Sequence, residues 1–302
     1  MLSTDFLIED KIPLQKIEDD FLKGKEISLY VLRLDLVHQH ISGNKWFKLK
    51  YNLEEVKKQA KNTLVTFGGA YSNHIVATAA AGKEFGFKTI GIIRGEELSE
   101  GDNPVLQFAK DCGMELHFIS REEYRKKDAS FLPGVTDDYY ILPEGGTNEL
   151  AVKGCSEISS LIDIPFDYIC CAVGTGGTIA GIISSLKENQ KAIGFPVLKG
   201  GEFLKNEIEK LVPSKTNFEL QTEYHFGGYA KKTEELMTYI TDFKSTYDIQ
   251  LDFVYTGKMM FGVFDLIKKN YFPKGATVVA IHTGGLFQFA ECKPRHQTHS
   301  CF

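Results

Sequence analysis

The fold class follows from one short segment, YICCAVGTGGT, at residues 168–178. Its first six residues, Tyr168–Val173, are almost continuously apolar, as expected of a strand that helices cover on both faces. The glycine-rich run Gly174–Thr178 follows at once, and a helical pattern continues over Thr178–Lys187. A strand, a glycine-rich turn and a helix in this order indicate an α/β protein with a parallel sheet.

The same alternation continues on both sides of this segment. Apolar, β-branched runs predict further strands at Ile27–Leu32, Thr63–Phe67, Lys88–Ile93, Glu115–Ile119, Tyr139–Leu142, Ala192–Val197 and Thr277–Ile281. Helical patterns, several of them opened by Ser, Thr or Asn, predict helices at Lys45–Ala60, Asn73–Phe85, Pro104–Cys112, Glu149–Leu161, Lys232–Tyr247 and Met259–Lys269. The fold class is therefore α/β, with parallel-rich sheets covered by helices.

Three of the predicted strands end in paired glycines. These are Gly68 with Gly69, the run Gly174–Gly177, and Gly284 with Gly285. In an open α/β sheet, ligands bind beyond the carboxyl ends of the strands, where glycines let backbone N–H groups approach an anion. We therefore expect one ligand site shared by the three strand ends.

The run Gly-Thr-Gly-Gly-Thr at 174–178 is a candidate phosphate-binding loop. Its glycines free several backbone N–H groups, and its two threonine hydroxyls add donors. The run lacks the terminal lysine of a Walker loop and the final glycine of the dinucleotide fingerprint, so ATP and NAD are disfavoured. A plain tight turn is the alternative interpretation of this run taken alone.

Composition and charge restrict the class of ligand. The chain has 302 residues, 43% of them apolar, which suits about two domains. Its 35 basic and 40 acidic residues give a net charge of -5 and form no basic stripe, so nucleic-acid binding is not expected. No stretch approaches the roughly 18 apolar residues that a membrane span needs. The six cysteines form no CxxC pair, which favours a reducing cytoplasm. We expect a cytoplasmic protein with a small-molecule ligand.

A second segment, SGNKWFKLKY at residues 42–51, points to a particular chemistry. With Arg33 and Asp35 upstream, it resembles the cofactor-lysine motif of the D-cysteine desulfhydrase and 1-aminocyclopropane-1-carboxylate deaminase family. Further stretches resemble the same family in the same order, namely FGGAYSNH, PEGGTN, VGTGGT, a Gly-Gly-Tyr before a helix, VYTGK and HTGG. The resemblance therefore extends over nearly the whole chain.

This resemblance implies a pyridoxal 5'-phosphate enzyme with the two-lobed fold of the tryptophan synthase β-subunit, known as fold type II. A large cofactor-binding domain would comprise residues 1–53 and 154–302, and a small α/β domain of residues 54–153 would be inserted between them. The cofactor would lie between the lobes, and the substrate would be a small amino acid. A homodimer is also expected, since symmetric dimers are the commonest oligomers.

The resemblance also assigns cofactor contacts. Lys45 would carry the cofactor as a Schiff base and act in catalysis, and Lys48, one helical turn further, would contact the phosphate. With Lys50 these lysines could instead form a solvated basic face, which is the alternative for the motif by itself. The loop that would bind the phosphate consists of Gly174, Thr175, Gly176, Gly177 and Thr178.

Four further positions resemble active-site residues of the family. Ser72 would lie beside the substrate, and Asn73 would face the ring hydroxyl of the cofactor. Tyr255 and Tyr229 would lie near the ring and the substrate, respectively. Helix capping is the alternative role for Ser72, and core packing is the alternative for each tyrosine. The surroundings of Ser72 do not read G-x-S-x-G, so an esterase triad is disfavoured.

Two threonines bear on the reaction. In the deaminases that open a cyclopropane ring, an acid follows the Val-Tyr pair and Leu follows the late His, whereas this chain has Thr256 and Thr283, as D-cysteine desulfhydrases do. A carboxylate at the pyridine nitrogen would make the cofactor a stronger electron sink than a hydroxyl would. The resemblance thus favours β-elimination that gives pyruvate, ammonia and sulfide. The alternatives are aminocyclopropane-carboxylate or related deamination, and a non-catalytic protein that binds pyridoxal phosphate or another phosphate ligand.

The chain departs from the family at two positions of the lysine motif. Phe47 replaces a common Arg, and Ser42 replaces the first Gly of GGNK, which leaves fine substrate specificity open. Near the C-terminus, four residues raise the question of a zinc site, but their spacing fits no standard pattern, so no metal is expected. These residues are Cys292, His296, His299 and Cys301.

Overall fold

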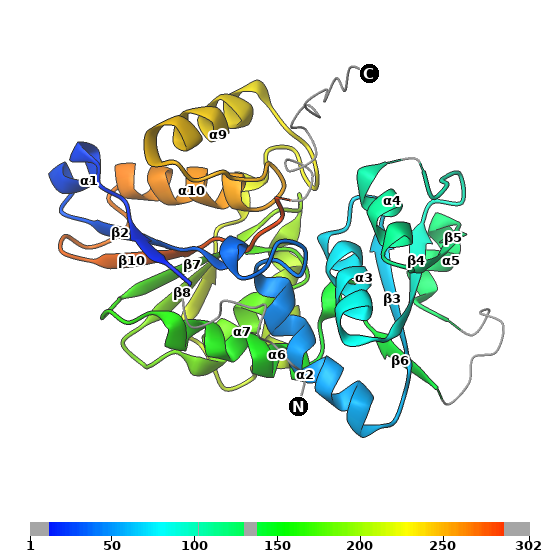
Figure 1. Ribbon diagram of the computed structural model, residues 1–302. Helices are drawn as coiled ribbons and strands as arrows, with labels where there is room; N and C mark the ends of the chain where they lie inside the picture. Colours follow the sequence, from blue (N-terminus) through cyan, green and yellow to red (C-terminus); the bar gives the residue numbers. More distant parts are fainter. Residues whose placement is uncertain (1–11, 102, 130–137, 287–302) are drawn as a thin grey trace, which may run out of the picture.

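Figure 1 shows the computed structural model, which describes residues 12–101, 103–129 and 138–286. The strands of these residues form two sheets. The larger has the order β1 (Leu14–Lys16), β2 (Ser28–Leu32), β10 (Thr277–Ile281), β7 (Tyr168–Val173), β8 (Lys191–Pro196), β9 (Phe218–Leu220). The smaller has the order β5 (Glu115–Ile119), β4 (Lys88–Arg94), β3 (Thr63–Gly69), β6 (Tyr139–Leu142). All neighbouring pairs are parallel except β1 with β2.

Helices occupy most of the connections between these strands. In the described part of the chain they are α1 (Asp20–Gly24), α2 (Asn44–Lys58), α3 (Asn73–Phe85), α4 (Pro104–Asp111), α5 (Arg121–Lys126), α6 (Glu149–Ser156), α7 (Gly177–Ser185), α8 (Leu204–Leu211), α9 (Glu234–Tyr247) and α10 (Thr256–Lys268). Short 3₁₀ turns add η2 (Leu34–Leu36), η3 (Glu144–Gly146), η4 (Glu157–Leu161), η5 (Gly201–Phe203) and η6 (Thr222–His225). Each of these helices is too short or too polar to span a lipid bilayer.

The α/β class and the predicted strands are confirmed, but several helix bounds are wrong. The helix predicted at Glu149–Leu161 changes at Ser156 from α-helix to the 3₁₀ turn η4. Helix α10 begins at Thr256, three residues before the predicted start, because the Asp252 carboxylate accepts its first backbone N–H groups. The sequence did not predict the short elements β1, β9, α1, α5 and α8.

Both faces of the six-stranded sheet are buried, as its apolar strands require. Along β7, Ile169 and Cys171 enter one hydrophobic cluster, whereas Cys170 and Ala172 enter the cluster on the opposite face. In Figure 1, α9 and α10 cover one face of this sheet and α6 and α7 cover the other. Side chains on both faces of β7 therefore pack against helices, which explains why the apolar run of this strand is unbroken.

One of these clusters continues into the smaller sheet. It joins α7 residues such as Ile179 to Leu53 of α2, and then to Ala77 of α3 and Leu64 of β3. All four strands of the smaller sheet lie within the predicted inserted segment, residues 54–153. The proposed limits of that domain fall inside α2 and α6, and they stay a prediction.

Helices α2 and α6 approach each other at a glycine. A Cβ atom added to Gly154 would lie 1.8 Å from the backbone O of Phe47, so only a hydrogen fits between the two backbones. Phe47 itself is buried in the core. This contact fixes the helix that carries the predicted cofactor lysine against the helix layer of the larger sheet.

We predict that Gly154→Ala lowers the free energy of unfolding by about 1–3 kcal/mol, because the new methyl group has no space between α2 and α6. Denaturant titration of the variant measures this change. Gly24→Ala is the matched control, since an added Cβ there meets no atom within 4 Å. Equal stability of the two variants would show that the helices can separate without cost.

Candidate active site

A cavity of about 620 Å³ lies where the two sheets meet. The smaller sheet contributes Gly69 and Arg94, which end strands β3 and β4. The larger sheet contributes Val173 at the end of β7 and Gly284 and Gly285 beyond β10. All three glycine-bearing strand ends singled out in the sequence therefore reach the same cavity.

Lys45 lies in the first turn of α2 and lines this cavity. Its Nζ donates a hydrogen bond of 2.8 Å to Oδ1 of Asn44, whose Nδ2 donates to Thr178 Oγ1 at 2.7 Å. Burial, with a smaller contribution from the charge of Lys48, lowers the pKa of Lys45 to about 7. Near neutral pH a large fraction of this amine is therefore uncharged and nucleophilic.

Lys48 lies one turn further along α2 and faces the glycine-rich loop. Its Nζ donates to Gly145 O at 2.7 Å, to Thr147 Oγ1 at 3.0 Å and to Thr175 Oγ1 at 3.4 Å. Burial lowers the pKa of Lys48 as well. The structure thus brings a lysine, threonine hydroxyls and the N-terminus of α7 together, which is the donor set that a phosphate needs.

Ser72 and Asn73 stand where β3 turns into α3. The Ser72 hydroxyl accepts a hydrogen bond from Ile75 N at 3.4 Å, so the capping role is present although Ser72 also lines the cavity. The Oδ1 atom of Asn73 is buried and has no hydrogen-bond partner among the described residues. A buried carbonyl oxygen without a donor is costly, and a hydroxyl group on a bound ligand would satisfy it.

Tyr255 and Tyr229 form one wall of the cavity. Their rings meet edge to face with centroids 6.2 Å apart, and the Tyr255 hydroxyl lies 3.4 Å from that of Tyr229. A Cβ on Gly174 would lie 3.2 Å from Cε1 of Tyr255, so this ring packs directly against the glycine-rich loop. Burial and the neighbouring Tyr229 raise the pKa of Tyr255, which keeps its phenol neutral.

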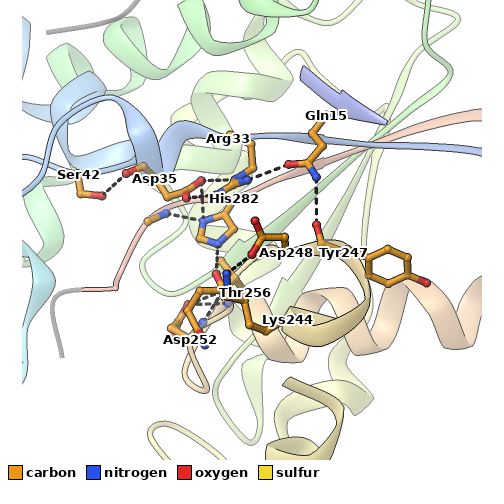
Figure 2. Close-up of polar contacts among 12 residues, drawn as sticks. Gln15, Arg33, Asp35, Ser42, Lys244, Tyr247, Asp248, Asp252, Thr256 and His282 are labelled. Carbon is orange, nitrogen blue, oxygen red and sulfur yellow. Dashed lines mark hydrogen bonds and ion pairs between the residues drawn. The ribbon is translucent and has the colours of Figure 1, made fainter. Parts of the chain in front are cut away.

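Thr283 and Thr256 have different surroundings. Thr283 lines the cavity, whereas Thr256 is fully buried and is not part of the lining. Figure 2 shows the Thr256 hydroxyl beside Asp252, to whose Oδ2 it donates at 2.6 Å. Gly177 is the other predicted site residue that does not line the cavity. All remaining predicted site residues line it, and their individual roles stay predictions.

A buried ion pair supports the chain that carries Thr283. Arg33 donates to both carboxylate oxygens of Asp35 at 2.9 and 2.8 Å, and Asp35 Oδ1 lies 3.4 Å from Nδ1 of His282 (Figure 2). The Nε2 atom of His282 lies 2.7 Å from Gln250 O. Because a carbonyl can only accept, Nε2 carries the proton. Nδ1 accepts from Gly284 N at 3.3 Å, so the imidazole is held on both sides, next to Thr283.

Several cavity residues were not among the predicted ones. They are Asn44, Arg94, Glu144 and Asp252. Arg94 could have been predicted as the glycines were, from its place at the carboxyl end of a strand. It is the last residue of β4 and pairs in register with Gly69. Asp252 follows no regular strand, and sequence periodicity gives no signal for such a position. The predicted residues Cys292, His296, His299 and Cys301 lie outside the described part of the chain.

The chain is similar to known proteins over nearly its whole described length. The family model described as "Pyridoxal-phosphate dependent enzyme" matches residues 9–284. A Pyrococcus furiosus protein named as a candidate 1-aminocyclopropane-1-carboxylate deaminase is 33% identical and covers 93% of this chain and 91% of its own length. The Arabidopsis thaliana mitochondrial bifunctional D-cysteine desulfhydrase/1-aminocyclopropane-1-carboxylate deaminase is 30% identical over 85% of this chain and 72% of its own. A crystal structure of an ACC deaminase homologue superposes with a TM-score of 0.80, at 28% identity, covering 93% of this chain and 92% of that one.

The fold and the match to the family model thus define a pyridoxal-phosphate-dependent enzyme of fold type II. Within that class, the chain belongs to the family of 1-aminocyclopropane-1-carboxylate deaminases and D-cysteine desulfhydrases. The predictions of fold type, family and cofactor are confirmed.

We predict that covalent attachment of pyridoxal phosphate to the apoprotein follows the pKa of Lys45. Only the neutral amine attacks an aldehyde, so at saturating cofactor the rate rises with pH below about 7 and levels off above it. Growth of the visible absorbance band after mixing measures this rate. A rate that keeps rising up to pH 10, as for a solvated lysine, would contradict the burial argument. Lys57→Ala, on the exposed face of α2, is the control that should leave the profile unchanged.

Proposed function

We propose that the protein catalyses β-elimination of D-cysteine or a closely related small amino acid, giving pyruvate, ammonia and sulfide. The observation that carries this proposal is Thr283 in the cavity wall, at the position where ring-opening deaminases of the family carry Leu. Thr256 stands where those deaminases carry an acidic residue, and it likewise has no carboxylate. A hydroxyl favours a protonated pyridine nitrogen less than a carboxylate does, and β-elimination tolerates the weaker electron sink.

Asp252 also brings a carboxylate to the cavity wall, but both of its oxygens are already engaged. Oδ1 accepts from the backbone N–H groups of Val254 and Tyr255 at 2.8 and 2.7 Å. Oδ2 accepts from both the N–H and the hydroxyl of Thr256, at 2.9 and 2.6 Å. Four donors hold the carboxylate against the start of α10. Its geometry therefore supports a structural role at the helix N-terminus.

The site residues fit the cofactor group by group. Lys45 would hold its aldehyde carbon, and Lys48 with the loop 174–178 would hold its phosphate. The orphaned oxygen of Asn73 would accept from its ring hydroxyl, and the Tyr255 ring would cover one face. When bound, pyridoxal phosphate supplies an aldehyde that captures the substrate amine and a conjugated ring that stabilises negative charge at Cα.

The proton transfers are assigned to side chains of this chain. The Lys45 amine, largely uncharged above pH 7 and placed in the cavity wall, would take the Cα proton of a bound substrate. Asn44 Oδ1 orients that amine from its 2.8 Å hydrogen bond. Ser72, at the start of α3, would bind the substrate carboxylate or assist the proton transfer, and Tyr229 would lie on the substrate side.

Deamination of 1-aminocyclopropane-1-carboxylate is the second candidate function. It is favoured by the names of the relatives from Pyrococcus furiosus and Arabidopsis thaliana, the second of which carries both activities in its name. Release of 2-oxobutyrate from the cyclic substrate would distinguish it from β-elimination.

The positions that depart from the family motif do not argue for a non-catalytic protein. Phe47 is buried in the core and does not line the cavity, so the loss of the usual Arg leaves the cavity wall intact. The Ser42 hydroxyl donates to Asp35 O at 3.3 Å, beside the ion pair that supports His282. We further propose a cytoplasmic homodimer, in keeping with the family resemblance and with the buried free thiols of Cys155, Cys170 and Cys171.

We predict that the holoenzyme releases sulfide and pyruvate in equal amounts from D-cysteine, and that Lys45→Ala lowers this rate roughly a thousandfold or more, since it removes the proposed base. Sulfide and pyruvate assays on the same samples measure both products. Lys57→Ala, exposed on the same helix, should keep the wild-type rate. A folded, cofactor-loaded protein that produces neither compound would exclude the desulfhydrase assignment while leaving the family membership intact.

A further inference from the structure

Arg94 places a positive charge at the edge of the cavity, on the side of the smaller sheet. It is the last residue of β4, in register with Gly69 at the end of β3, and both residues line the cavity. The loop that follows β3 carries Ser72, which also lines the cavity. Arg94 therefore faces the same space as the predicted substrate-binding residues, from the lobe opposite Lys45.

The guanidinium is held in place but is not neutralised. Its Cζ lies 5.7 Å from the centroid of the Tyr124 ring, and a Cβ on Gly69 would lie 3.5 Å from its Nη2. Among the residues that the structure describes, the Arg94 guanidinium has no hydrogen bond and no ion pair, and this residue is exposed. The Arg94 guanidinium can therefore donate two parallel hydrogen bonds to a carboxylate or a phosphate.

The neighbouring carboxylate does not cancel this charge. Glu144 also lines the cavity, but its Oε1 accepts from the Tyr124 hydroxyl at 2.8 Å and its Oε2 pairs with Lys127 Nζ at 2.8 Å. Both carboxylate oxygens of Glu144 are therefore engaged by Tyr124 and Lys127, and neither forms an ion pair with Arg94. Glu97, which follows in sequence, is paired with Arg121.

We infer that Arg94 forms an anion-binding subsite for the β-substituent of the substrate. The preferred substrates are then amino acids whose β-substituent is an anionic leaving group, such as a phosphate or a sulfonate. This inference rests on the proposed β-elimination, because that reaction separates an anion from Cβ. The Cα–H bond breaks with its proton passing to Lys45, the Cβ–X bond breaks with its electron pair leaving on X, and a Cα–Cβ double bond forms. Water then releases pyruvate and ammonium.

The test compares aspartate with its neutral isostere asparagine, each as both enantiomers. Neither carries a leaving group at Cβ, so their binding to the holoenzyme can be measured at equilibrium from the change in visible absorbance and by calorimetry. We expect the wild-type protein to bind one enantiomer of aspartate about tenfold more tightly than the matching asparagine. Arg94→Gln should abolish this preference, and Arg94→Lys should keep part of it.

Arg121→Gln is the control, since it removes an exposed arginine of the same lobe that lies outside the cavity lining and is paired with Glu97. An equal preference in wild type and Arg94→Gln would overturn the inference. An equal loss of aspartate and asparagine binding in Arg94→Gln would also overturn it, because Arg94 would then hold the carboxylate common to both. Failure to release sulfide from D-cysteine leaves this comparison intact and counts against the proposed function alone.

Discussion

The site depends on one tight backbone contact between the start of α2 and the chain that leaves β10. Gly43 precedes α2 with φ of +63°, and a Cβ there would lie 2.0 Å from the carbonyl O of Thr283. Glycine permits both this conformation and this approach. The contact places Lys45 in the cavity wall, where loss of hydration lowers the pKa of its amine to about 7. An amine on a freely solvated helix start would stay charged at neutral pH.

The proposed reaction also uses groups from both lobes. Lys45 and Tyr255 face the cavity from elements next to the larger sheet, whereas Ser72, Asn73 and Arg94 come from strand ends of the smaller one. A single hydrophobic cluster passes from α7 through α2 to α3, so the two halves share a packed core. Relative movement of the lobes would change the distance between the proposed base and the proposed substrate contacts, which makes the packing of α2 a condition for catalysis.

Much of this arrangement was predictable from the sequence, because it follows from local rules. Unbroken apolar runs such as Tyr168–Val173 identify strands buried on both faces, and the paired glycines identify the cavity end of the sheets. The direction of the Thr256 side chain was not predictable. Its hydroxyl turns to Asp252, four residues away, and that contact competes with any role towards the cofactor.

Arg94 shows a second reason why sequence patterns fall short. A charged residue at the end of an apolar strand is usually solvated surface, and Arg94 lines the cavity because β3 and β4 end side by side there. The short elements β1, β9 and α5 were missed for a related reason. Three to six residues carry too little periodicity, and tertiary packing decides their conformation.

Peptide mapping of the borohydride-reduced holoprotein by mass spectrometry tests the role of Lys45 most directly. If the desolvated amine is the point of attachment, reduction fixes one cofactor per chain, on the peptide that contains Lys45. An adduct on Lys48 or on an exposed lysine, or no adduct at saturating pyridoxal phosphate, would contradict the chemistry derived from this site.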